Sequence, residues 1–325
     1  MEQAEHASPT SPDVLWAISD GRAGNARQAG ALAAALSNGT AQTLTVLGRA
    51  PWCWLAPRRF PGAEHAFGAK FAAAMQQPPQ LAIGCGRQAA LATRLLRAHG
   101  AKAVQILDPR IDPRHWDLVI APEHDGLRGD NVIALLGSLH PVDDAWLADA
   151  RQRFAALASL PQPRTAVLIG GPSAHARFDM MAVEALAGLV DAALARDGGS
   201  VLLTTSRRTP RALREALRHR YGATPGVVWT GPEDGDNPYP GLLAWADRIV
   251  CSPDSVNMIS EACATRAPVF VFDPERVNGR PRRFLDVLRA RGRVRAMDQT
   301  LVPFAVEPLR ETARVAAEVR RRLGL

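Results

Sequence analysis

The 325-residue sequence has no apolar run long enough to cross a bilayer, although hydrophobic residues make up 47% of it. Its N-terminal segment, MEQAEHASPTSPD, is polar and has no apolar centre, so it does not resemble a signal peptide. We therefore expect a cytoplasmic protein with a sizeable core, long enough to form two α/β domains.

Cysteine and lysine are both scarce. The four cysteines, Cys53, Cys85, Cys251 and Cys263, lack the spacing of a metal site, and we interpret them as reduced packing residues. Lys70 and Lys102 are the only lysines among 39 basic residues, so the net charge of +7 comes from arginine. An arginine-rich protein is attracted to phosphates, and we expect a nucleotide, an anionic glycolipid or a peripheral contact with the inner membrane.

Aromatic residues are also few, at 6% of the chain, and no nucleic-acid-binding module is visible. Nucleic acid is therefore not an expected partner. The glycines after the first predicted strand, in Asp20-Gly21-Arg22-Ala23-Gly24, do not have the GxGxxG spacing of a dinucleotide site.

Short apolar strands alternate with helices, beginning with a strand at Val14–Ser19 and a helix from Gln28 that ends at Asn38-Gly39. The alternation restarts at Thr165, after Pro161-Gln162-Pro163. This pattern predicts an α/β fold of two Rossmann-like domains, whose parallel sheets face each other across a cleft. We place them at residues 1–160 and 161–302, followed by an arginine-rich helix over 303–325.

Polar loops at the carboxyl ends of parallel strands line the ligand crevice of such sheets. In the first half these loops contain Asp20, Arg87, Asp108 and Glu123–Asp125. In the second half they contain Gly170-Gly171 and Ser206-Arg207-Arg208. Two glycines let a backbone approach a ligand closely, and arginines suit phosphate oxygens, although both groups also suit ordinary turns.

The stretch from Arg248 to Asp273 predicts a strand, a helix and a second strand in close succession. Asp254 and Ser255 stand where the helix begins, and free N–H groups at such an end attract a phosphate. We expect Asp254 to turn back as the N-cap and to leave Ser255 nearest the ligand. An ordinary capped helix is the alternative.

A family resemblance supports a functional interpretation. The motifs DGRAGN, GCGR, PEHD, GGPS, TSRRTP, NPYP and SPDSVNMISEA occur in this order between Val14 and Phe272. Together they resemble bacterial members of the mitochondrial-fission "elongated mitochondria" family of plants, which are similar to GT-B glycosyltransferases of surface polysaccharide and lipopolysaccharide synthesis. The resemblance implies a GT-B-like fold, Ser255 at the sugar-nucleotide diphosphate, Glu261 at the ribose and a last helix that packs back on the first domain.

These features favour transfer of a sugar from a nucleotide-sugar donor to a cell-envelope glycan or glycolipid acceptor. Such a reaction needs diphosphate neutralisation, for which we expect a helix end with Ser206, Arg207 and Arg208, and neither a metal ion nor a cofactor. An inverting enzyme also needs a base. Asp20 is our first choice and His124, between Glu123 and Asp125, is the competing one.

Each candidate base could instead have a structural role. The Asp20 carboxylate could hold its own loop in place, and a histidine between two acids, such as His124, often forms hydrogen bonds that hold a loop. The segment Pro51–Gly62, rich in proline, arginine and tryptophan, is expected to be an acceptor-binding loop or a packed cover over the sheet. A non-catalytic nucleotide- or glycan-binding protein, or an adaptor, is the alternative function. An NAD-dependent sugar-nucleotide epimerase is not supported, because neither Tyr221 nor Tyr239 has a lysine four residues on.

Overall fold

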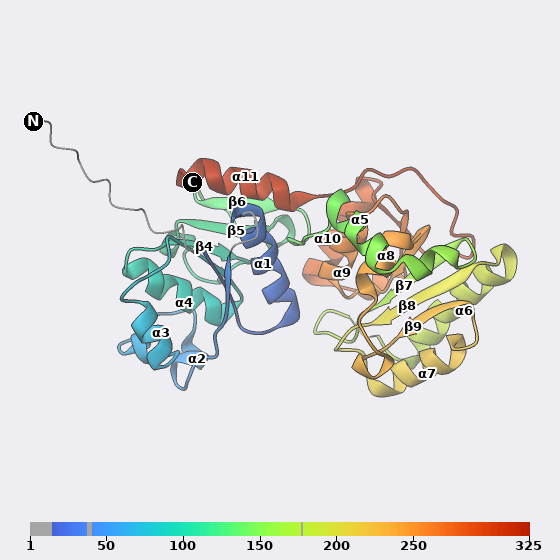
Figure 1. Ribbon diagram of the computed structural model, residues 1–325, viewed down its shortest axis with the longest axis horizontal. Helices are drawn as coiled ribbons and strands as arrows, with labels where there is room; N and C mark the ends of the chain where they lie inside the picture. Colours follow the sequence, from blue (N-terminus) through green and yellow to red (C-terminus); the bar gives the residue numbers. More distant parts are fainter. Residues whose placement is uncertain (1–14, 38–40, 177) are drawn as a thin grey trace, which may run out of the picture. The chain divides into compact units, whose positions relative to one another are not determined.

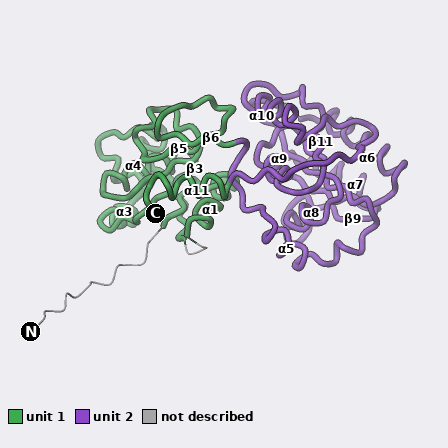
Figure 2. Tube along the Cα trace, turned by 90° about the horizontal axis from the view of Figure 1, so that it is seen from above, with its two compact units in different colours: residues 1–135, 312–325 green, residues 136–311 purple. Residues whose placement is uncertain are grey.

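The computed structural model describes residues 15–37, 41–176 and 178–325. Val14 and Asn38-Gly39, predicted at a strand start and a helix end, lie outside these ranges. The chain forms two compact units (Figure 2). Unit 1 consists of Met1–Leu135 with Thr312–Leu325, and unit 2 consists of Leu136–Glu311.

Unit 1 is built on a six-stranded, fully parallel sheet with the strand order β2-β1-β3-β4-β5-β6. Figure 1 labels β4, β5 and β6 of this sheet. The strands are β1 (Leu15–Ser19), β2 (Gln42–Thr45), β3 (Leu81–Cys85), β4 (Lys102–Ile106), β5 (Leu118–Pro122) and β6 (Val132–Leu135). The central strands β3 and β5 are buried along their whole length. Continuous apolar strands are expected where helices cover both faces of a parallel sheet.

The helices of unit 1 are α1 (Ala23–Ser37), α2 (Trp52–Leu55), α3 (Ala69–Ala74), α4 (Arg87–Ala98) and α11 (Glu311–Leu323). Helix α11 returns from the far end of the sequence. Lys102 Nζ donates to the Leu323 carbonyl at 2.5 Å, and the Arg320 guanidinium donates to the Ala35 carbonyl at 2.5 Å. Val315, Ala316 and Val319 form its buried face, so the end of the chain is an integral part of unit 1.

Unit 2 has a second six-stranded parallel sheet, with the order β12-β11-β10-β7-β8-β9. The strands are β7 (Arg164–Ile169), β8 (Ser200–Thr205), β9 (Gly226–Trp229), β10 (Arg248–Cys251), β11 (Val269–Val271) and β12 (Val294–Ala296). Its helices are α5 (Asp144–Arg153), α6 (Met180–Asp197), α7 (Arg211–Tyr221), α8 (Tyr239–Trp245), α9 (Val256–Cys263) and α10 (Gly279–Ala290).

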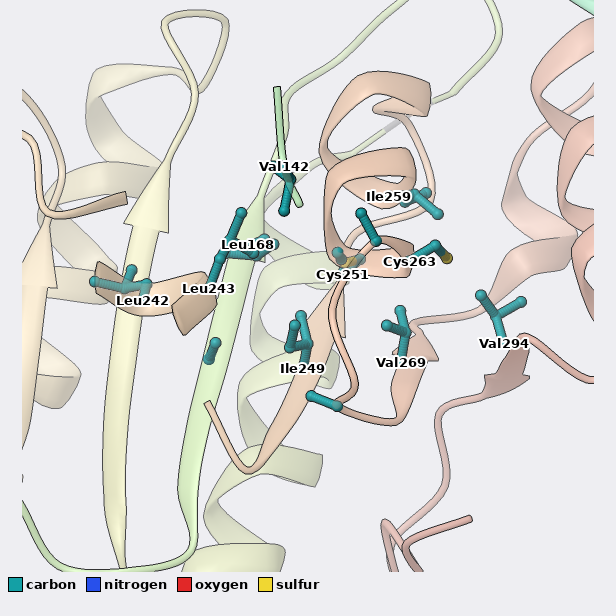
Figure 3. Close-up of a cluster of buried hydrophobic side chains, with 14 of the residues drawn as sticks. Val142, Leu168, Leu242, Leu243, Ile249, Cys251, Ile259, Cys263, Val269 and Val294 are labelled. Atoms are coloured by element: carbon teal, nitrogen blue, oxygen red, sulfur yellow. The ribbon is translucent and has the colours of Figure 1, made fainter. Parts of the chain in front are cut away.

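A buried apolar cluster joins one face of this sheet to helices α8 and α9 (Figure 3). Ile249 and Cys251 of β10 lie in it with Ile259 and Cys263 of α9, and all four are at most 1% exposed. Burial of one large aliphatic side chain contributes about 1.5–3 kcal/mol. This cluster therefore fixes the start of α9 relative to the carboxyl end of β10, where the predicted ligand site lies.

The predicted fold class is confirmed, because each half is a parallel α/β sheet, while several boundaries differ. Helix α1 begins at Ala23 instead of Gln28, and the short helix α3 was not predicted. The last helix begins at Glu311 and not near 303. Pro303 and Pro308 explain this difference, because proline has no N–H for a helical hydrogen bond.

The division between the units falls after Leu135, whereas the sequence placed it near Pro161. Helix α5 explains the difference. Its Leu147 and Ala150 share a buried cluster with Leu242 of α8, and Arg151 Nε donates to the Ala244 carbonyl at 2.9 Å. Residues 136–160 therefore pack with the second sheet. No helix of the described residues has the length and apolarity needed to span a bilayer.

Candidate functional site

The strand order of unit 2 creates a switch point between β7 and β10. From β7 the chain moves outward through β8 and β9, and then it returns to pair β10 with the other side of β7. The loops after β7 and β10 consequently leave the sheet in opposite directions, and ligands bind at such points in open α/β sheets. Gly170-Gly171 follows β7 and Ser252–Ser255 follows β10, so the sheet brings these predicted segments together.

The Asp254 carboxylate ties these loops to one another, and its side chain is fully buried. One oxygen accepts from the Gly171 backbone N–H at 2.8 Å and from the Arg208 guanidinium at 2.8 Å. The other accepts from the Ser252 hydroxyl at 2.7 Å, and the same Ser252 oxygen accepts from the Gly170 backbone N–H at 2.7 Å. The buried charge is thus paired and hydrogen-bonded on both oxygens, as burial of a carboxylate requires.

The glycine pair leaves room for the protein's own atoms. A Cβ at Gly170 would lie 2.0 Å from an Asp254 carboxylate oxygen, and one at Gly171 would lie 2.5 Å from the Arg208 carbonyl oxygen. From the sequence, the two glycines are expected to let a ligand approach the backbone closely. In the structure, Asp254 and the loop after β8 make that close approach.

The N-cap of α9 differs from the predicted one. Ser255, and not Asp254, caps the helix, since its hydroxyl accepts from the Met258 backbone N–H at 3.5 Å. The physical reason is that the Asp254 carboxylate binds stronger donors, including a guanidinium. The Val256 and Asn257 N–H groups of the first turn have no partner within the helix. Ser255 therefore caps a helix start whose Val256 and Asn257 N–H groups point out of the helix, and anion binding there stays a prediction.

Glu261 lies inside unit 2 and is 4% exposed. The Tyr239 hydroxyl donates to its carboxylate at 2.5 Å, which links α9 to α8. This contact also explains the tyrosine of the NPYP motif. The predicted ribose contact would require this buried carboxylate to reach a ligand, and the Tyr239 bond instead holds it in the interior.

The two arginines of the loop after β8 differ in their contacts within the described residues. Arg208 is bonded to Asp254, and the Ser206 hydroxyl lies 3.2 Å from the Thr209 hydroxyl, which in turn donates to the Gly170 carbonyl. Arg207 is exposed, and within the described part of the chain no carboxylate or carbonyl pairs with its side chain. Arg207 is therefore the guanidinium of this loop that is available to an anion.

A hollow of about 340 Å³ lies beside these loops and was not found from the sequence. Its lining consists of Ser173, Ala174, His175, Ala176, Arg276 and Asn278. The Asn278 N–H donates to the His175 carbonyl at 3.1 Å, which joins the loop after β7 to the one after β11. Ser173, the last residue of the GGPS motif, is the residue of this lining that the sequence motifs included. Nothing in the sequence pattern paired it with Arg276, which is 103 residues further along the chain.

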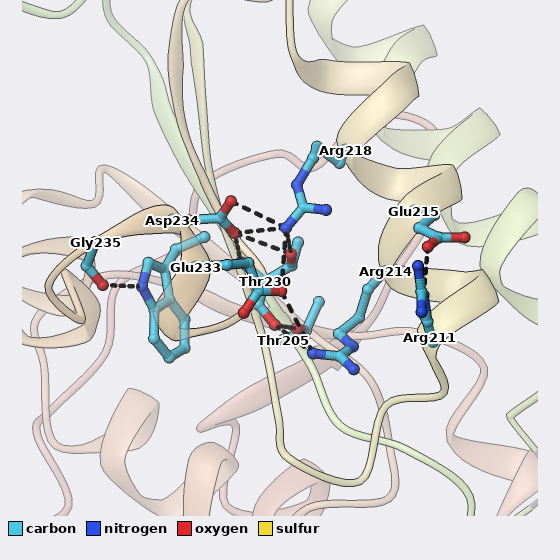
Figure 4. A network of polar contacts seen from close by, with 10 residues as sticks. Thr205, Arg211, Arg214, Glu215, Arg218, Thr230, Glu233, Asp234 and Gly235 are labelled. Atoms are coloured by element: carbon cyan, nitrogen blue, oxygen red, sulfur yellow. Dashed lines mark hydrogen bonds and ion pairs between the residues drawn. The ribbon is translucent and has the colours of Figure 1, made fainter.

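The expectation of a metal-free site overlooked one acidic triplet, Asp234-Gly235-Asp236, which has the Asp-x-Asp spacing of some metal sites. In the structure, Asp234 accepts from the Arg218 guanidinium at 2.9 Å and from the Thr230 hydroxyl at 2.9 Å (Figure 4). Asp234 thus joins the loop after β9 to α7. Across residues 15–37, 41–176 and 178–325, no three His, Cys, Asp or Glu side chains are grouped to hold a metal ion.

Unit 1 has its own switch point, between β1 and β3, and Asp20 follows β1 there. One Asp20 oxygen accepts from the Asn25 amide at 2.9 Å and from the Arg22 backbone N–H at 3.2 Å. The other oxygen lies 3.8 Å from Arg22 Nε. Burial, together with the charge of Asp20, raises the pKa of the Cys85 thiol well above its usual range, so Cys85 remains a neutral packing residue.

His124 lies in the 3-10 turn Glu123–Asp125 after β5, with its Nε2 4.0 Å from an Asp125 oxygen. Strands β1 and β5 are separated by β3 and β4, which corresponds to roughly 14 Å between Asp20 and His124 at the sheet edge. The fold therefore does not bring the two candidate bases together, and they remain alternatives.

Arg87 is the first residue of α4, after β3, and its side chain binds the short helix α2. Its guanidinium donates to the Cys53 carbonyl at 3.2 Å and to the Trp54 carbonyl at 3.3 Å. The predicted substrate contact of Arg87 competes with these two bonds. Trp54 itself is 72% exposed, so the segment around α2 does not form a fully packed cover over the sheet.

Comparisons with known proteins place this fold. A UDP-GlcNAc 2-epimerase from Methanocaldococcus jannaschii is similar over 96% of this chain and 99% of its own, with a TM-score of 0.55 and 11% identity. The protein Os79 from O. sativa in complex with UDP is similar over 95% and 91% of the two chains, with a TM-score of 0.51 and 13% identity. These likenesses show the fold, which is that of the GT-B glycosyltransferases and related epimerases. The missing Tyr-x-x-x-Lys pair counts only against an NAD-dependent epimerase and does not bear on an epimerase with this fold.

Sequence relatives are more specific. The mitochondrial fission protein ELM1 of Arabidopsis thaliana is 33% identical over 277 residues, which is 76% of this chain and 64% of the plant protein. The chain thus spans less than two thirds of that relative. The family model described as "Mitochondrial fission ELM1" matches residues 23–323. The family expected from the motifs is confirmed, and the chain belongs to the mitochondrial fission ELM1 family.

Proposed function

We propose that the protein is a GT-B-type glycosyltransferase, which moves a sugar from a nucleotide-sugar donor to a cell-envelope glycan or glycolipid without a metal ion. The observation that carries this proposal is the switch point of unit 2. There the start of α9, the exposed Arg207 and the hollow beside Arg276 all lie at the carboxyl edge of one parallel sheet. These are the groups that a diphosphate requires.

The roles within the donor site follow from which groups are available. The Val256 and Asn257 N–H groups of α9 and the Arg207 guanidinium would bind the diphosphate, because no other group of the described residues pairs with them. Asp254 and Arg208 would hold the loops in place instead of contacting the donor. Glu261 would support α9 through Tyr239, which revises the ribose contact suggested by the family resemblance.

On the acceptor side we assign the base to Asp20. Its Asn25 bond orients the carboxylate. Among the described residues, its second oxygen has only the long Arg22 contact, so it is available to accept a proton. Removal of a proton from an acceptor hydroxyl during attack is the role of a base in an inverting transferase. His124 is the alternative base.

Ligand screening tests the donor proposal first. A thermal-shift screen of nucleotides and nucleotide sugars should show one stabilising group, since a ligand at a hundred times its dissociation constant adds about 2.7 kcal/mol. Calorimetry with the best nucleotide should then show a loss of about 1.5–3 kcal/mol for Arg207→Ala. Arg266→Ala, another exposed arginine of unit 2, is the matched control. Unchanged affinity in Arg207→Ala would move the donor site elsewhere.

The family name favours a second candidate, a non-catalytic binding or adaptor protein, because the plant relative is named for mitochondrial fission. Both candidates predict that a nucleotide binds. Only a transferase releases the nucleotide from its sugar repeatedly when a glycan or glycolipid acceptor is added, and product analysis separates this from epimerisation of the sugar. A tight nucleotide complex with no turnover on any acceptor extract would favour the adaptor.

A further inference from the structure

A second hollow, of about 430 Å³, lies in unit 1 away from the switch point of that unit. Its lining consists of Arg59, Arg94, Arg97, Ala98 and His115, so four of its five residues are basic types. It lies along the second half of α4, between that helix and the loop that follows α2. The donor and acceptor assignments above use none of these residues.

The positive charge of this hollow is only partly balanced within the chain. Arg97 is paired with Asp117 at 2.9 Å. Arg94 donates to the Pro57 carbonyl and lies over the Trp116 ring at 5.8 Å, and burial together with the charge of Arg59 lowers its pKa. Among the described residues, no carboxylate lies within salt-bridge distance of Arg59 or Arg94. An anion in the hollow would reduce the repulsion between the Arg59 and Arg94 guanidinium groups.

The segment that contains Arg59 also has exposed apolar side chains. Trp54 is 72% exposed and Phe60 is 42% exposed, and Leu47, which precedes α2, is 71% exposed. This segment is held against α4 at two points, because Arg87 binds the Trp54 carbonyl and Arg94 binds the Pro57 carbonyl. Figure 1 shows α2 and α4 in unit 1. The seven-residue step from Arg87 to Arg94 corresponds to about 10 Å along the helix axis.

We propose that this part of unit 1, Leu47–Phe60 with the hollow of Arg59 and Arg94, is a docking surface for an anionic phospholipid bilayer. A lipid phosphate would enter the arginine hollow, while Trp54 and Phe60 would lie at the level of the head groups. Tryptophan favours that interface, and arginines near an anionic leaflet are attracted to it.

Two other sources of phosphate fit the observations less well. A free phosphate would use the arginines but would gain nothing from exposed Trp54 and Phe60. A single-stranded nucleic acid could stack bases on these two rings, but it could not use the aliphatic side chain of Leu47 in that way. Lipid is the partner that uses the basic and the apolar residues together.

Vesicle sedimentation with the full chain tests the proposal and needs neither donor nor acceptor. The protein should sediment with phosphatidylcholine vesicles that contain about 30% phosphatidylglycerol, and it should remain in solution with phosphatidylcholine alone. Arg59→Glu and Trp54→Ser should each lower the bound fraction at least about fivefold. Arg321→Glu on α11 reverses a charge elsewhere, and Met181→Ser on α6 removes an exposed apolar group elsewhere, so both should change binding little. All four positions are exposed, and the melting temperature of each variant is measured to show that it folds.

Several results would overturn the proposal. Equal losses in the control variants would show general charge attraction. Displacement by millimolar inorganic phosphate, with no effect of Trp54→Ser, would indicate a free-phosphate site. Preferential binding of single-stranded RNA over vesicles would indicate a nucleic-acid surface. Because the assay involves no nucleotide, a failure here leaves the transferase proposal unaffected, and failure of that proposal leaves vesicle binding unaffected.

Discussion

Each sheet places an aspartate beside its switch point, Asp20 after β1 in unit 1 and Asp254 after β10 in unit 2. Asp254 is fully buried, and both of its oxygens accept hydrogen bonds, including one from the Arg208 guanidinium. Asp20 is partly exposed, and hydrogen bonds from Asn25 and the Arg22 N–H reach only one of its oxygens.

This difference separates a carboxylate that maintains structure from one that can react. A carboxylate with both oxygens bonded to fixed donors cannot accept a substrate proton without the loss of those bonds. A carboxylate that is oriented through one oxygen and open at the other satisfies the geometric requirement for a base. Sequence position alone ranks the two residues equally, whereas their hydrogen bonds do not.

The largest expected effect tests the reactive side of this comparison. Asp20→Asn keeps the shape and the acceptor oxygen for Asn25 but removes the basic oxygen, so transfer should slow by about 10²–10⁴-fold. Nucleotide affinity and melting temperature should stay near those of the wild type. Turnover is measured as acceptor-dependent nucleotide release, with His124→Gln as the parallel variant. Full turnover in Asp20→Asn with loss in His124→Gln would transfer the role of base to the loop after β5.

The next effect concerns how closely each edge is packed. Gly171→Ala would press its Cβ against the backbone of the loop after β8, so it should lower the free energy of unfolding by about 3 kcal/mol or more. Gly86→Ala in unit 1 meets the Asn25 and Asp20 side chains, which can shift, and its positive φ of 95° adds strain of about 1–2 kcal/mol.

Two helical glycines are the controls for these variants. At Gly188 of α6 and Gly30 of α1, no atom of the described residues outside the local helix backbone lies within 4 Å of an added Cβ. Alanine there should therefore stabilise each unit by about 0.5–1 kcal/mol. Chemical denaturation measures all four variants. If Gly86→Ala destabilised more than Gly171→Ala, the edge of unit 1 would be the more rigid one, which is the reverse of our comparison.

A smaller effect is expected when the partner of the buried carboxylate is removed. Arg208→Ala leaves Asp254 buried with its Gly171 and Ser252 bonds but without its counter-charge, and should cost about 2 kcal/mol of stability. Arg207→Ala, its exposed neighbour, should leave stability within about 0.5 kcal/mol. Denaturant titration compares the two. An unchanged free energy of unfolding in Arg208→Ala would mean that the bonds of Asp254 to Gly171 and Ser252 are sufficient to hold the loops together.

Much of the fold was predictable, because strand-helix alternation and carboxyl-end loops follow from local apolar pattern and glycine placement. The pairing of Asp254 with Arg208 was not, since 46 residues separate them and adjacency depends on strand order. The Ser255 cap was missed for the same reason: local propensity favours either residue, and a distant guanidinium decides. Arg276 and Asn278 entered the candidate site only through the packing of β11 beside β10.

The smallest effect extends the comparison to the opposite, amino edge of the unit 2 sheet. There Asp197 binds Arg196 and the buried Arg248 at the start of β10. These two guanidinium groups lower the pKa of Asp197 to about 2, below the value of about 3.9 expected in the unfolded chain. Its stabilisation is therefore complete above about pH 4 and is lost as the pH falls through about 2.

Between about pH 4 and pH 2, the loss of the Asp197 ion pairs should lower the free energy of unfolding by about 1 kcal/mol, because solvent screens these charges. Asp197→Asn should remove this contribution. The variant should also be less stable at neutral pH, because Arg248 loses its carboxylate partner. Asp149→Asn, in an exposed helical pair with Arg153, is the control and should leave the acid limb unchanged. Urea denaturation at several pH values measures this. If the free energy of unfolding fell equally steeply below about pH 4 in Asp197→Asn and in the wild type, other carboxylates would be responsible for the loss of stability in acid.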